Sequence, residues 1–360
     1  MMPDGTTDSD RIARATSTYL ANIGSVIARS ASDTEAPNFV VSGTTVVGSI
    51  TANVNNPFPL LGGRAIPVSV NAKARKESSI PVCVLGLNQN NAAAFHQNGN
   101  STFNATNCAA QFNSANSSGM QQDGGATARA AAFSVAGGAS GGSFQPAPTT
   151  HSARIDDPFS QLRFPAAGPC INAPTFRDDN VTLNPGTYCG GIDVRSGAIV
   201  TLNPGVYLMK DGSFIVQSGS TVNGSEVMIA FTGEAGNWPA SLMLLGGATM
   251  NVTSPADGDY AGIQFFGTRE TYTKPGWVSI GGSGNAAVNL TFDGVMYLPN
   301  QSLWIYGGST VIGKAPNLIL VADEIWVQGN ASLTVTQENS RNLRAFAAMP
   351  KLSFGAVLMR

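Results

Sequence analysis

Apolar and polar positions alternate along much of the chain, which is the pattern of β-strands with one buried face. The stretches 39–54 and 65–77 alternate in this way on either side of a Pro/Gly break, and this predicts a small antiparallel sheet. Residues 11–28 instead space their apolar side chains as one face of a helix does. The first 78 residues are therefore expected to form a helix and a small sheet.

After Cys189 an apolar pattern recurs six times. Aligned on their glycines, the segments are IDVRSGAIV, FIVQSGSTV, LMLLGGATM, VSIGGSGNAAV, LWIYGGSTV and IWVQGNASL, and they share three columns in which all eighteen residues are apolar. The first column holds Ile192, Phe214, Leu242, Val278, Leu303 and Ile325; the second holds Val194, Val216, Leu244, Ile280, Ile305 and Val327; the third holds Val200, Val222, Met250, Val288, Val311 and Leu333. Chance does not explain this match in a chain that is 42% hydrophobic.

These repeats predict the fold class. Each one has the pattern of a strand, a corner of glycine or small polar residues, and a second strand, and successive repeats begin about 21 to 35 residues apart. A unit of this size cannot bury its own apolar face, so such repeats stack. We expect a mainly β protein built around a parallel β-helix of about six or more rungs, with the segments before 180 and after 340 covering its ends.

The segment VTLNPGTYCGGIDVRSGAIVTLNPGVYL, residues 181–208, contains Val-Thr-Leu-Asn-Pro-Gly-x-Tyr twice. Proline fixes φ at the second position of a turn, and glycine accepts the positive φ that a type II turn needs at the third. The two copies therefore predict stacked corners on successive rungs, with Tyr188 over Tyr207. The residues assigned to these corners are Pro185, Gly186, Pro204 and Gly205.

Between residues 84 and 153 the composition shifts to Asn, Gln, Ala, Ser and Gly, and only Asp123 and Arg129 are acidic or basic. A segment with so few large apolar side chains buries too little surface to offset its ordering entropy, so much of 113–153 is interpreted as loop or linker. The expected organisation is a helix and sheet in 1–78, a low-complexity segment and cap in 79–156, the β-helix in 157–340, and a C-terminal cap or tail in 341–360.

Charge and histidine content disfavour several classes of function. With 20 basic and 22 acidic residues, the chain has no electrostatic footprint for nucleic acid or an anionic membrane. It has only two histidines and no Cys-x-x-Cys spacing, which disfavours zinc. The pair Asp257 and Asp259 is not part of the Gly-Gly-x-Gly-x-Asp repeat of calcium-binding β-helices. We expect no metal and no cofactor.

The four cysteines allow three pairings. Pairing of sequence neighbours would close two loops of moderate length, and we favour two disulfides, which imply an oxidising compartment. The alternative is four buried thiols in a cytosolic protein. The residues concerned are Cys83, Cys108, Cys170 and Cys189.

Enzymes with this fold that act on polysaccharides place paired carboxylates or a base on one outer face. The close acidic pairs here are Asp156 with Asp157, Asp178 with Asp179, Asp257 with Asp259, and Asp323 with Glu324. None recurs at the repeat spacing, so turn capping is preferred over catalysis. Trp304 and Trp326 share one column between inward-facing neighbours, which predicts a ladder on the outer face. Such a ladder either shields the solenoid or binds a sugar or a partner.

Several stretches resemble one protein family: VNNPFPLLGGRAIPVSVNAKA (54–74), the Cys83–Cys108 segment, DPFSQLRFPAAGPC (157–170) and LNPGTYCGGIDVRSGAIVTLNPGVYLMKDGSF. The chain resembles the TadG-related pilus-assembly proteins, TadE/TadG-like minor pilins of the bacterial tight-adherence (Flp) pilus, over most of 40–335. The double LNPG-x-Y with Cys189-Gly-Gly is its most specific element.

The resemblance implies a pilin-like N-terminal region, a location in the cell envelope or outside the cell, and a role in pilus assembly or adhesion without enzymatic activity. Its partners would be other pilus-assembly or envelope proteins, or a surface glycan. The family's apolar membrane anchor is not present before residues 11–28. Either the natural start lies upstream of Met1 or the anchor has been lost. A polysaccharide lyase or glycoside hydrolase is the alternative function.

Overall fold

The computed structural model describes the following residues: 9, 12–13, 16–17, 31–34, 37–42, 45–54, 65–75, 79–233, 240–270, 276–282, 288–312, 318–337, 344–352 and 357–359. The chain divides into two compact units, one formed by residues 1–79 with 353–360 and the other by residues 80–352. Each unit is described separately below.

The smaller unit contains a five-stranded antiparallel sheet. Residues 12–13 and 16–17 of the predicted helix are helical, and the rest of 11–28 lies outside the described residues. The strands are β1 (Ala31–Thr34), β2 (Asn38–Ser42), β3 (Thr45–Val54), β4 (Ile66–Arg75) and β33 (Val357–Met359).

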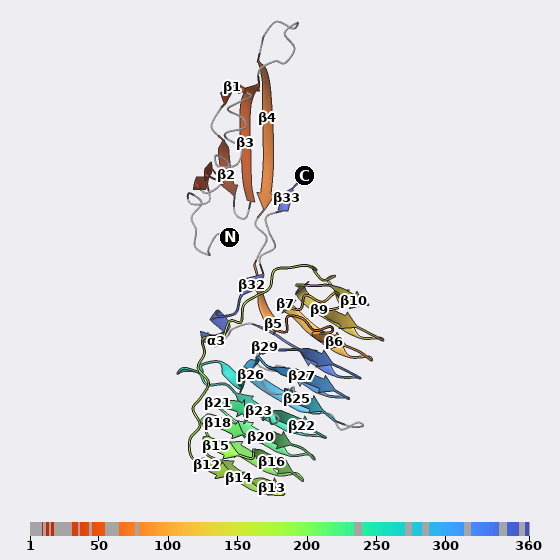
Figure 1. The fold of residues 1–360 in the computed structure, drawn as a ribbon, viewed down its shortest axis with the longest axis vertical. Helices are drawn as coiled ribbons and strands as arrows, with labels where there is room; N and C mark the ends of the chain where they lie inside the picture. The colour runs from red at the N-terminus through yellow and green to blue at the C-terminus, as the bar shows by residue number, and fades with distance from the viewer. Residues whose placement is uncertain are drawn as a thin grey trace. The chain divides into compact units, whose positions relative to one another are not determined.

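The larger unit is a parallel β-helix with three walls (Figure 1). Its first wall is a ten-stranded sheet in which each strand pairs in parallel with the strands of the neighbouring rungs. In stacking order these strands are β13 (Thr175–Arg177), β16 (Ile192–Arg195), β19 (Phe214–Val216), β22 (Leu242–Leu245), β25 (Gly276–Gly281), β27 (Gln301–Tyr306), β30 (Ile325–Val327), β6 (Phe95–Gln97), β8 (Met120–Gln122) and β10 (Ala139–Gly141).

The other two walls are parallel stacks of the same kind, and three long strands run through both of them: β26 (Asn289–Leu298), β7 (Thr102–Phe112) and β9 (Thr127–Val135). The second wall also contains β14 (Asn180–Leu183), β17 (Ile199–Leu202), β20 (Thr221–Gly224), β23 (Thr249–Thr253), β28 (Thr310–Ile312), β31 (Ser332–Thr334) and β11 (Phe144–Gln145). The third contains β12 (Cys170–Asn172), β15 (Gly186–Cys189), β18 (Gly205–Lys210), β21 (Val227–Thr232), β24 (Ile263–Gly267), β29 (Leu318–Ala322) and β5 (Ile80–Gly86).

The strand register confirms the first two predicted apolar columns, because their members are aligned on successive rungs of the ten-stranded sheet. The third column is correct at five of its six positions. Leu290, not Val288, pairs with Met250 and Val311. Val288 lies two residues earlier, where other rungs have small corner residues, and it is buried there. The glycine alignment missed this shift because the repeat at 278–288 carries extra residues in its corner.

The order of rungs in space differs from their order in the chain. Strand β6 stacks on β30, although 230 residues separate Phe95 from Ile325. In Figure 1 the yellow N-terminal strands therefore continue the stack beyond the blue C-terminal ones. The chain enters the solenoid at this junction, builds rungs outward to β10, and then returns to the far end to begin β12 and β13.

Residues 80–145 are thus part of the β-helix, and the prediction of loop or linker in 113–153 is wrong for β8 to β11. Each of these rungs buries phenylalanine rings among small residues, and Phe95 contacts the rings of Phe103, Phe112 and Phe144. Buried glutamines satisfy their own polar groups, since Gln97 donates to the carbonyl oxygens of Ser101 and Thr127. Composition alone underestimated order because the neighbouring rung supplies most of the buried surface.

A strap, residues 146–169, connects β11 to β12 and crosses several rungs. Asn113 Nδ2 donates to the Ile155 carbonyl at 2.7 Å, Arg269 Nη1 donates to the Leu162 carbonyl at 2.7 Å, and the Gly168 amide donates to Thr187 Oγ1 at 2.8 Å. The strap is therefore attached to the walls along its length.

The C-terminal segment was expected to cap an end of the solenoid, and its strands pair elsewhere. After the short helix α3 (Arg344–Ala347), β32 (Lys351–Leu352) pairs with β5, which lies inside the third wall between β29 and β7. Strand β33 then joins the small sheet beside β4. The reason is that the last repeat is covered by β5 to β7, so no free end exists there for residues 341–360 to cover.

The Asn-Pro-Gly corners lie on adjacent rungs. The rings of Tyr188 and Tyr207 stack with centroids 6.0 Å apart and an interplanar angle of 14°, as predicted. Asn203 Nδ2 donates to Asn184 Oδ1 at 2.8 Å, so the corner asparagines form a ladder. Gly205 has φ 138°, whereas Gly186 does not have a positive φ. The type II turn predicted for both copies is therefore wrong at Pro185-Gly186.

Two disulfides join sequence neighbours, Cys83 to Cys108 and Cys170 to Cys189. They confirm the preference for two disulfides and indicate an oxidising, extracytoplasmic environment. Across the described residues, no helix combines the length and the apolar character needed to cross a membrane.

Candidate binding face

The outward positions of four neighbouring strands in the ten-stranded sheet carry five rings. Along β27, β30 and β6 the burial alternates, so that every second side chain points away from the core, and on β25 the exposed residue is Trp277. We call the outward group the aromatic face; its members are Trp277, Trp304, Tyr306, Trp326 and His96. The column predicted for the two tryptophans is confirmed, since Trp304 pairs with Trp326.

The rings of the aromatic face contact one another mainly by their edges. Trp277 meets Trp304 at 6.0 Å between centroids with an interplanar angle of 76°, and Trp326 meets His96 at 5.3 Å and 87°. Trp304 also contacts Tyr306 at 5.0 Å. Edge-to-face pairs leave one ring face free to contact a ligand. Trp277 is the most accessible of these residues, with 45% of its surface exposed.

Polar side chains hold two of the rings, Trp304 and His96, in place. The Trp304 indole Nε1 donates to Gln328 Oε1 at 2.9 Å. His96 Nε2 lies 3.2 Å from Asp123 Oδ2, and Gln121 Nε2 donates to the same carboxylate oxygen at 2.9 Å. Since these bonds fix the rings before any ligand arrives, the entropic cost of ordering them on binding is reduced.

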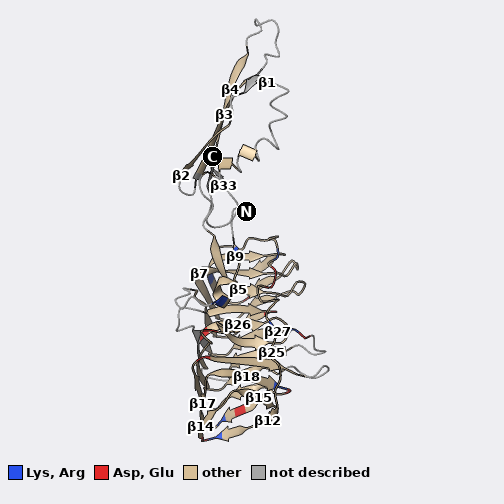
Figure 2. Ribbon diagram, turned by 90° about the vertical axis from the view of Figure 1, so that its left-hand side faces the viewer, with Lys and Arg blue, Asp and Glu red and all other residues tan. Residues whose placement is uncertain are grey.

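Charge is concentrated at one end of this sheet. Arg177, Asp193 and Arg195 lie on β13 and β16, where Arg195 and Asp193 form an ion pair. The other eight strands contain no Asp, Glu, Lys or Arg. Figure 2 shows how sparsely charged residues are distributed over the solenoid. The strands of the aromatic face therefore present rings and neutral polar groups, and the carboxylate in contact with them is that of Asp123, which directly follows β8.

The acidic pair next to the aromatic face is held by asparagines. Asn88 Nδ2 donates to both oxygens of Asp323, at 3.2 and 3.1 Å, and Asn91 Nδ2 donates to Glu324 Oε1 at 2.6 Å. Burial raises the pKa of both carboxyl groups, and these hydrogen bonds offset part of the rise. These hydrogen bonds thus join the turn that precedes β30 to the segment that follows β5, more than 230 residues earlier in the chain.

No family model, curated protein or solved structure matches this chain. The face must therefore be interpreted from its own chemistry. The other acidic pairs lie outside the strands of the aromatic face: Asp156 and Asp157 are in the strap, Asp178 and Asp179 follow β13, and Asp257 and Asp259 are exposed in the turn before β24.

Sequence reasoning found two of the five rings. It missed Trp277 because VSIGGSGNAAV was aligned from Val278, one residue later, and Trp277 faces outward from the adjoining position. Tyr306 directly follows the inward-facing Ile305 in the same alignment, so the alternation of side chains along a strand also predicts that Tyr306 faces outward. His96 had no usable signal, since its place on the face depends on the pairing of β6 with β30.

Proposed function

We propose that this protein is a non-enzymatic component of a bacterial cell envelope, of the Flp/Tad pilus type, that acts in pilus assembly or surface adhesion through its β-helix. The aromatic face is the contact surface, and its partners are other envelope or pilus proteins or a surface glycan. The N-terminal unit is the pilin-like part, and the rungs that carry the six repeats are its binding region. The protein works at the outer side of the membrane or after secretion.

One observation carries this proposal: an aromatic face on strands that contain no Asp, Glu, Lys or Arg, β25, β27, β30 and β6. Tryptophan and tyrosine are enriched at protein interfaces and dominate their binding energy, whereas lysine and glutamate are depleted there. The same rings suit the apolar faces of sugars. A surface with few charges also fits adhesion, because its binding weakens little at high salt.

The small sheet supports an assembly role for the N-terminal unit. Ile66, Val68 and Val70 alternate along β4 and so share one face of the sheet, with exposed fractions of 47%, 42% and 55%. Apolar side chains gathered on an exposed face mark an interaction site more often than chance.

The enzymatic alternative requires carboxylates that are free to exchange protons with a substrate. Asp123 contacts the aromatic face through His96 and also accepts a hydrogen bond from Gln121. Asp323 and Glu324 precede β30 and accept hydrogen bonds from Asn88 and Asn91. This favours binding over hydrolysis or elimination.

The test is to replace the gene in the source organism by one that encodes Trp277→Ser with Trp304→Ser. Both residues point outward, so we expect the protein to fold and to reach the envelope fraction, while surface attachment falls at least fivefold. Ile199→Ser is the matched control, because Ile199 is an exposed apolar residue (42%) on β17 in another wall. Full attachment by the double variant, or wild-type protein in the cytoplasmic fraction with free thiols, would contradict the proposal.

A further inference from the structure

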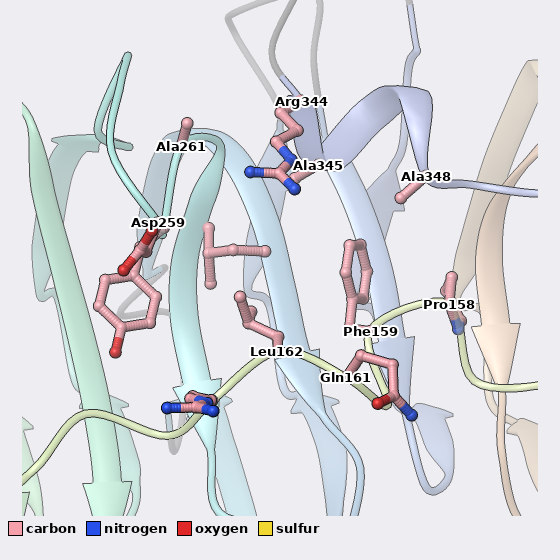
Figure 3. Close-up of a pocket in the computed structure, with 12 residues that line it drawn as sticks. Pro158, Phe159, Gln161, Leu162, Asp259, Ala261, Arg344, Ala345 and Ala348 are labelled. Atoms are coloured by element: carbon pink, nitrogen blue, oxygen red, sulfur yellow. The ribbon is translucent and has the colours of Figure 1, made fainter.

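The strap and α3 enclose a pocket of about 510 Å³ on the larger unit (Figure 3). It lies between strap residues 158–163, the turn that leads into β24, and the helix. The volume is within the range of small-molecule sites. The aromatic face does not contribute to it.

The floor of the pocket is apolar. Phe159, Ala261, Ile263 and Ala345 line it and are each buried, and Leu162 of the strap adds an aliphatic side. Figure 3 shows the Phe159 ring and the Leu162 side chain projecting between the strap and the wall strands. A floor of this kind favours the apolar part of a ligand.

The rim carries three charged side chains, Arg163, Arg344 and Asp259, all exposed. Among the described residues, neither guanidinium group has a hydrogen-bond or ion-pair partner. Two cations and one anion give the rim a net charge of +1. A ligand with a single negative charge therefore neutralises it, whereas Asp259 repels a second negative charge.

The Tyr260 hydroxyl adds a neutral donor beside these charges. Burial, and then the neighbouring Asp259, raise the pKa of Tyr260, so the group stays protonated over the neutral range. A carboxylate accepts hydrogen bonds from phenols and guanidinium groups alike, and Arg matches its two oxygens in a bidentate way.

The walls of the pocket are formed before binding. Arg269 holds the strap through the carbonyl oxygens of Phe159 and Leu162, and its Nε donates to the Tyr297 hydroxyl at 2.8 Å. That hydroxyl donates to Asp157 Oδ2 at 2.5 Å, and Phe159 packs on the Tyr297 ring at 5.2 Å. A pocket held in this way costs little reorganisation on binding.

We propose that this pocket binds a monocarboxylate with an apolar body, with the carboxylate held by Arg163 and Arg344 and the apolar part on Phe159, Leu162 and Ile263. Two sources have this chemistry: a free aliphatic acid, and the C-terminal carboxylate of a polypeptide that ends in an apolar residue. The site does not depend on the proposed envelope function.

The experiment is isothermal titration calorimetry of the full chain with octanoate, with N-acetyl-phenylalanine and with the uncharged N-acetyl-phenylalaninamide. We expect at least one of the two acids to bind. If N-acetyl-phenylalanine binds, we expect its affinity to be at least tenfold higher than that of its amide. Octanoate alone would identify a free acid, and N-acetyl-phenylalanine alone a polypeptide terminus. No binding of either acid at millimolar concentration, or equal binding of acid and amide, would overturn the proposal.

Two variants locate the binding. Arg163→Gln with Arg344→Gln removes both cations without breaking a hydrogen bond or ion pair of the described residues, and is expected to weaken binding of the acid at least tenfold. Ala348→Trp places a large ring in the pocket from an exposed position on its rim and is expected to abolish binding. Arg129→Gln, at an exposed position on β9, is the control and should bind as wild type. Unchanged binding by the first two variants would place the ligand elsewhere and overturn the assignment.

Discussion

Gly205 is constrained by the rung next to it. A Cβ atom at this position would lie within 2.4 Å of the Pro185 ring, and its φ of 138° is one that other residues rarely adopt. We expect Gly205→Ala to lower the free energy of unfolding by about 2 kcal/mol, because the extra methyl group overpacks a corner that cannot move away from the proline.

Urea denaturation followed by circular dichroism measures this cost. Gly308→Ala is the matched control, since a Cβ there meets nothing within 4 Å and its φ is outside the strained range. If both variants lose the same stability, contact between the stacked corners is not what selects glycine at position 205.

Glu324 should give the protein an unusual response to acid. Its folded-state pKa lies above the ordinary value of 4.5, chiefly because of burial. Between the ordinary and the raised values the folded chain binds more protons than the unfolded chain, so stability attributable to this group increases as pH falls through that window. A carboxylate that forms an ion pair in the folded state usually has a lowered pKa, and its contribution to stability decreases as pH falls.

The measurement compares wild type with Glu324→Gln at pH 7 and pH 5. Glutamine keeps an oxygen acceptor for Asn91 but does not titrate. We expect the variant to be at least as stable as wild type at pH 7, and the difference between the two to shrink at pH 5. A difference that grows in acid would show that the Glu324 carboxylate stabilises the fold.

At the scale of elements, the two disulfides differ in access. Cys83 and Cys108 are fully buried between β5 and β7, whereas Cys170 is exposed and Cys189 half-buried at the β12–β15 end. Thiol–disulfide exchange needs approach of a thiolate to the sulfur. Mild reductant under native conditions should therefore open Cys170–Cys189 first.

Alkylation followed by intact mass spectrometry gives the order directly. Two added groups, mapped to Cys170 and Cys189, are expected in native buffer and four in denaturant. Equal rates of alkylation at all four cysteines would mean that the wall around Cys83–Cys108 opens as readily as the end of the solenoid.

Arg269 joins the strap to the third wall. It donates to two strap carbonyl oxygens and lies over the Tyr297 ring at 5.1 Å, while Tyr297 in turn holds Asp157. Loss of hydrogen bonds from a charged group costs roughly 1.5 to 3 kcal/mol each when partners stay buried. Arg269→Gln should release the strap locally before it unfolds the rungs.

Limited trypsin digestion detects this release, because the strap contains Arg154 and Arg163. We expect cleavage after Arg163 to accelerate at least tenfold in Arg269→Gln and to stay at the wild-type rate in Arg129→Gln. Equal protection of the strap in both variants would assign its order to Phe159 and Phe164 packing alone.

These elements show where sequence reasoning succeeded. The columns that contain Ile192 and Val194 were recovered because an inward residue of a solenoid repeats on every rung, and that regularity is visible in one dimension. The Val288 error arose in a corner, where residue number is free to vary. The rungs at 80–145 were missed because alanine, serine and glutamine can pack inside a stacked rung, although a sequence rich in them does not have the pattern of a core. The contact between Asp157 and Tyr297 could not be predicted because 140 residues separate the two in the chain.

At the scale of the whole larger unit, the stack joins the rungs that precede the six repeats in the sequence to the last of those repeats. Strand β6 lies between β30 and β8, and β7 receives β31 in the second wall. In a solenoid each rung is stabilised mainly by its nearest neighbours. A local defect should therefore spread by position in the stack and not by position in the sequence.

Phe95→Ala tests this directly. Phe95 is fully buried, and its truncation should cost about 3 to 5 kcal/mol. Hydrogen exchange is expected to rise most in β30 and β8, the two neighbours of β6, and least in β13 at the far end. Phe214 is also fully buried, and the control variant Phe214→Ala should raise exchange most in β16 and β22, the neighbours of β19.

If the Phe95 variant leaves Ile325–Val327 protected while β8 exchanges, then β6 and β30 are not cooperative neighbours, and the N-terminal rungs fold as a separate block. If both variants accelerate all strands equally, the unit unfolds in one step and its end rungs owe their stability to rungs far along the stack.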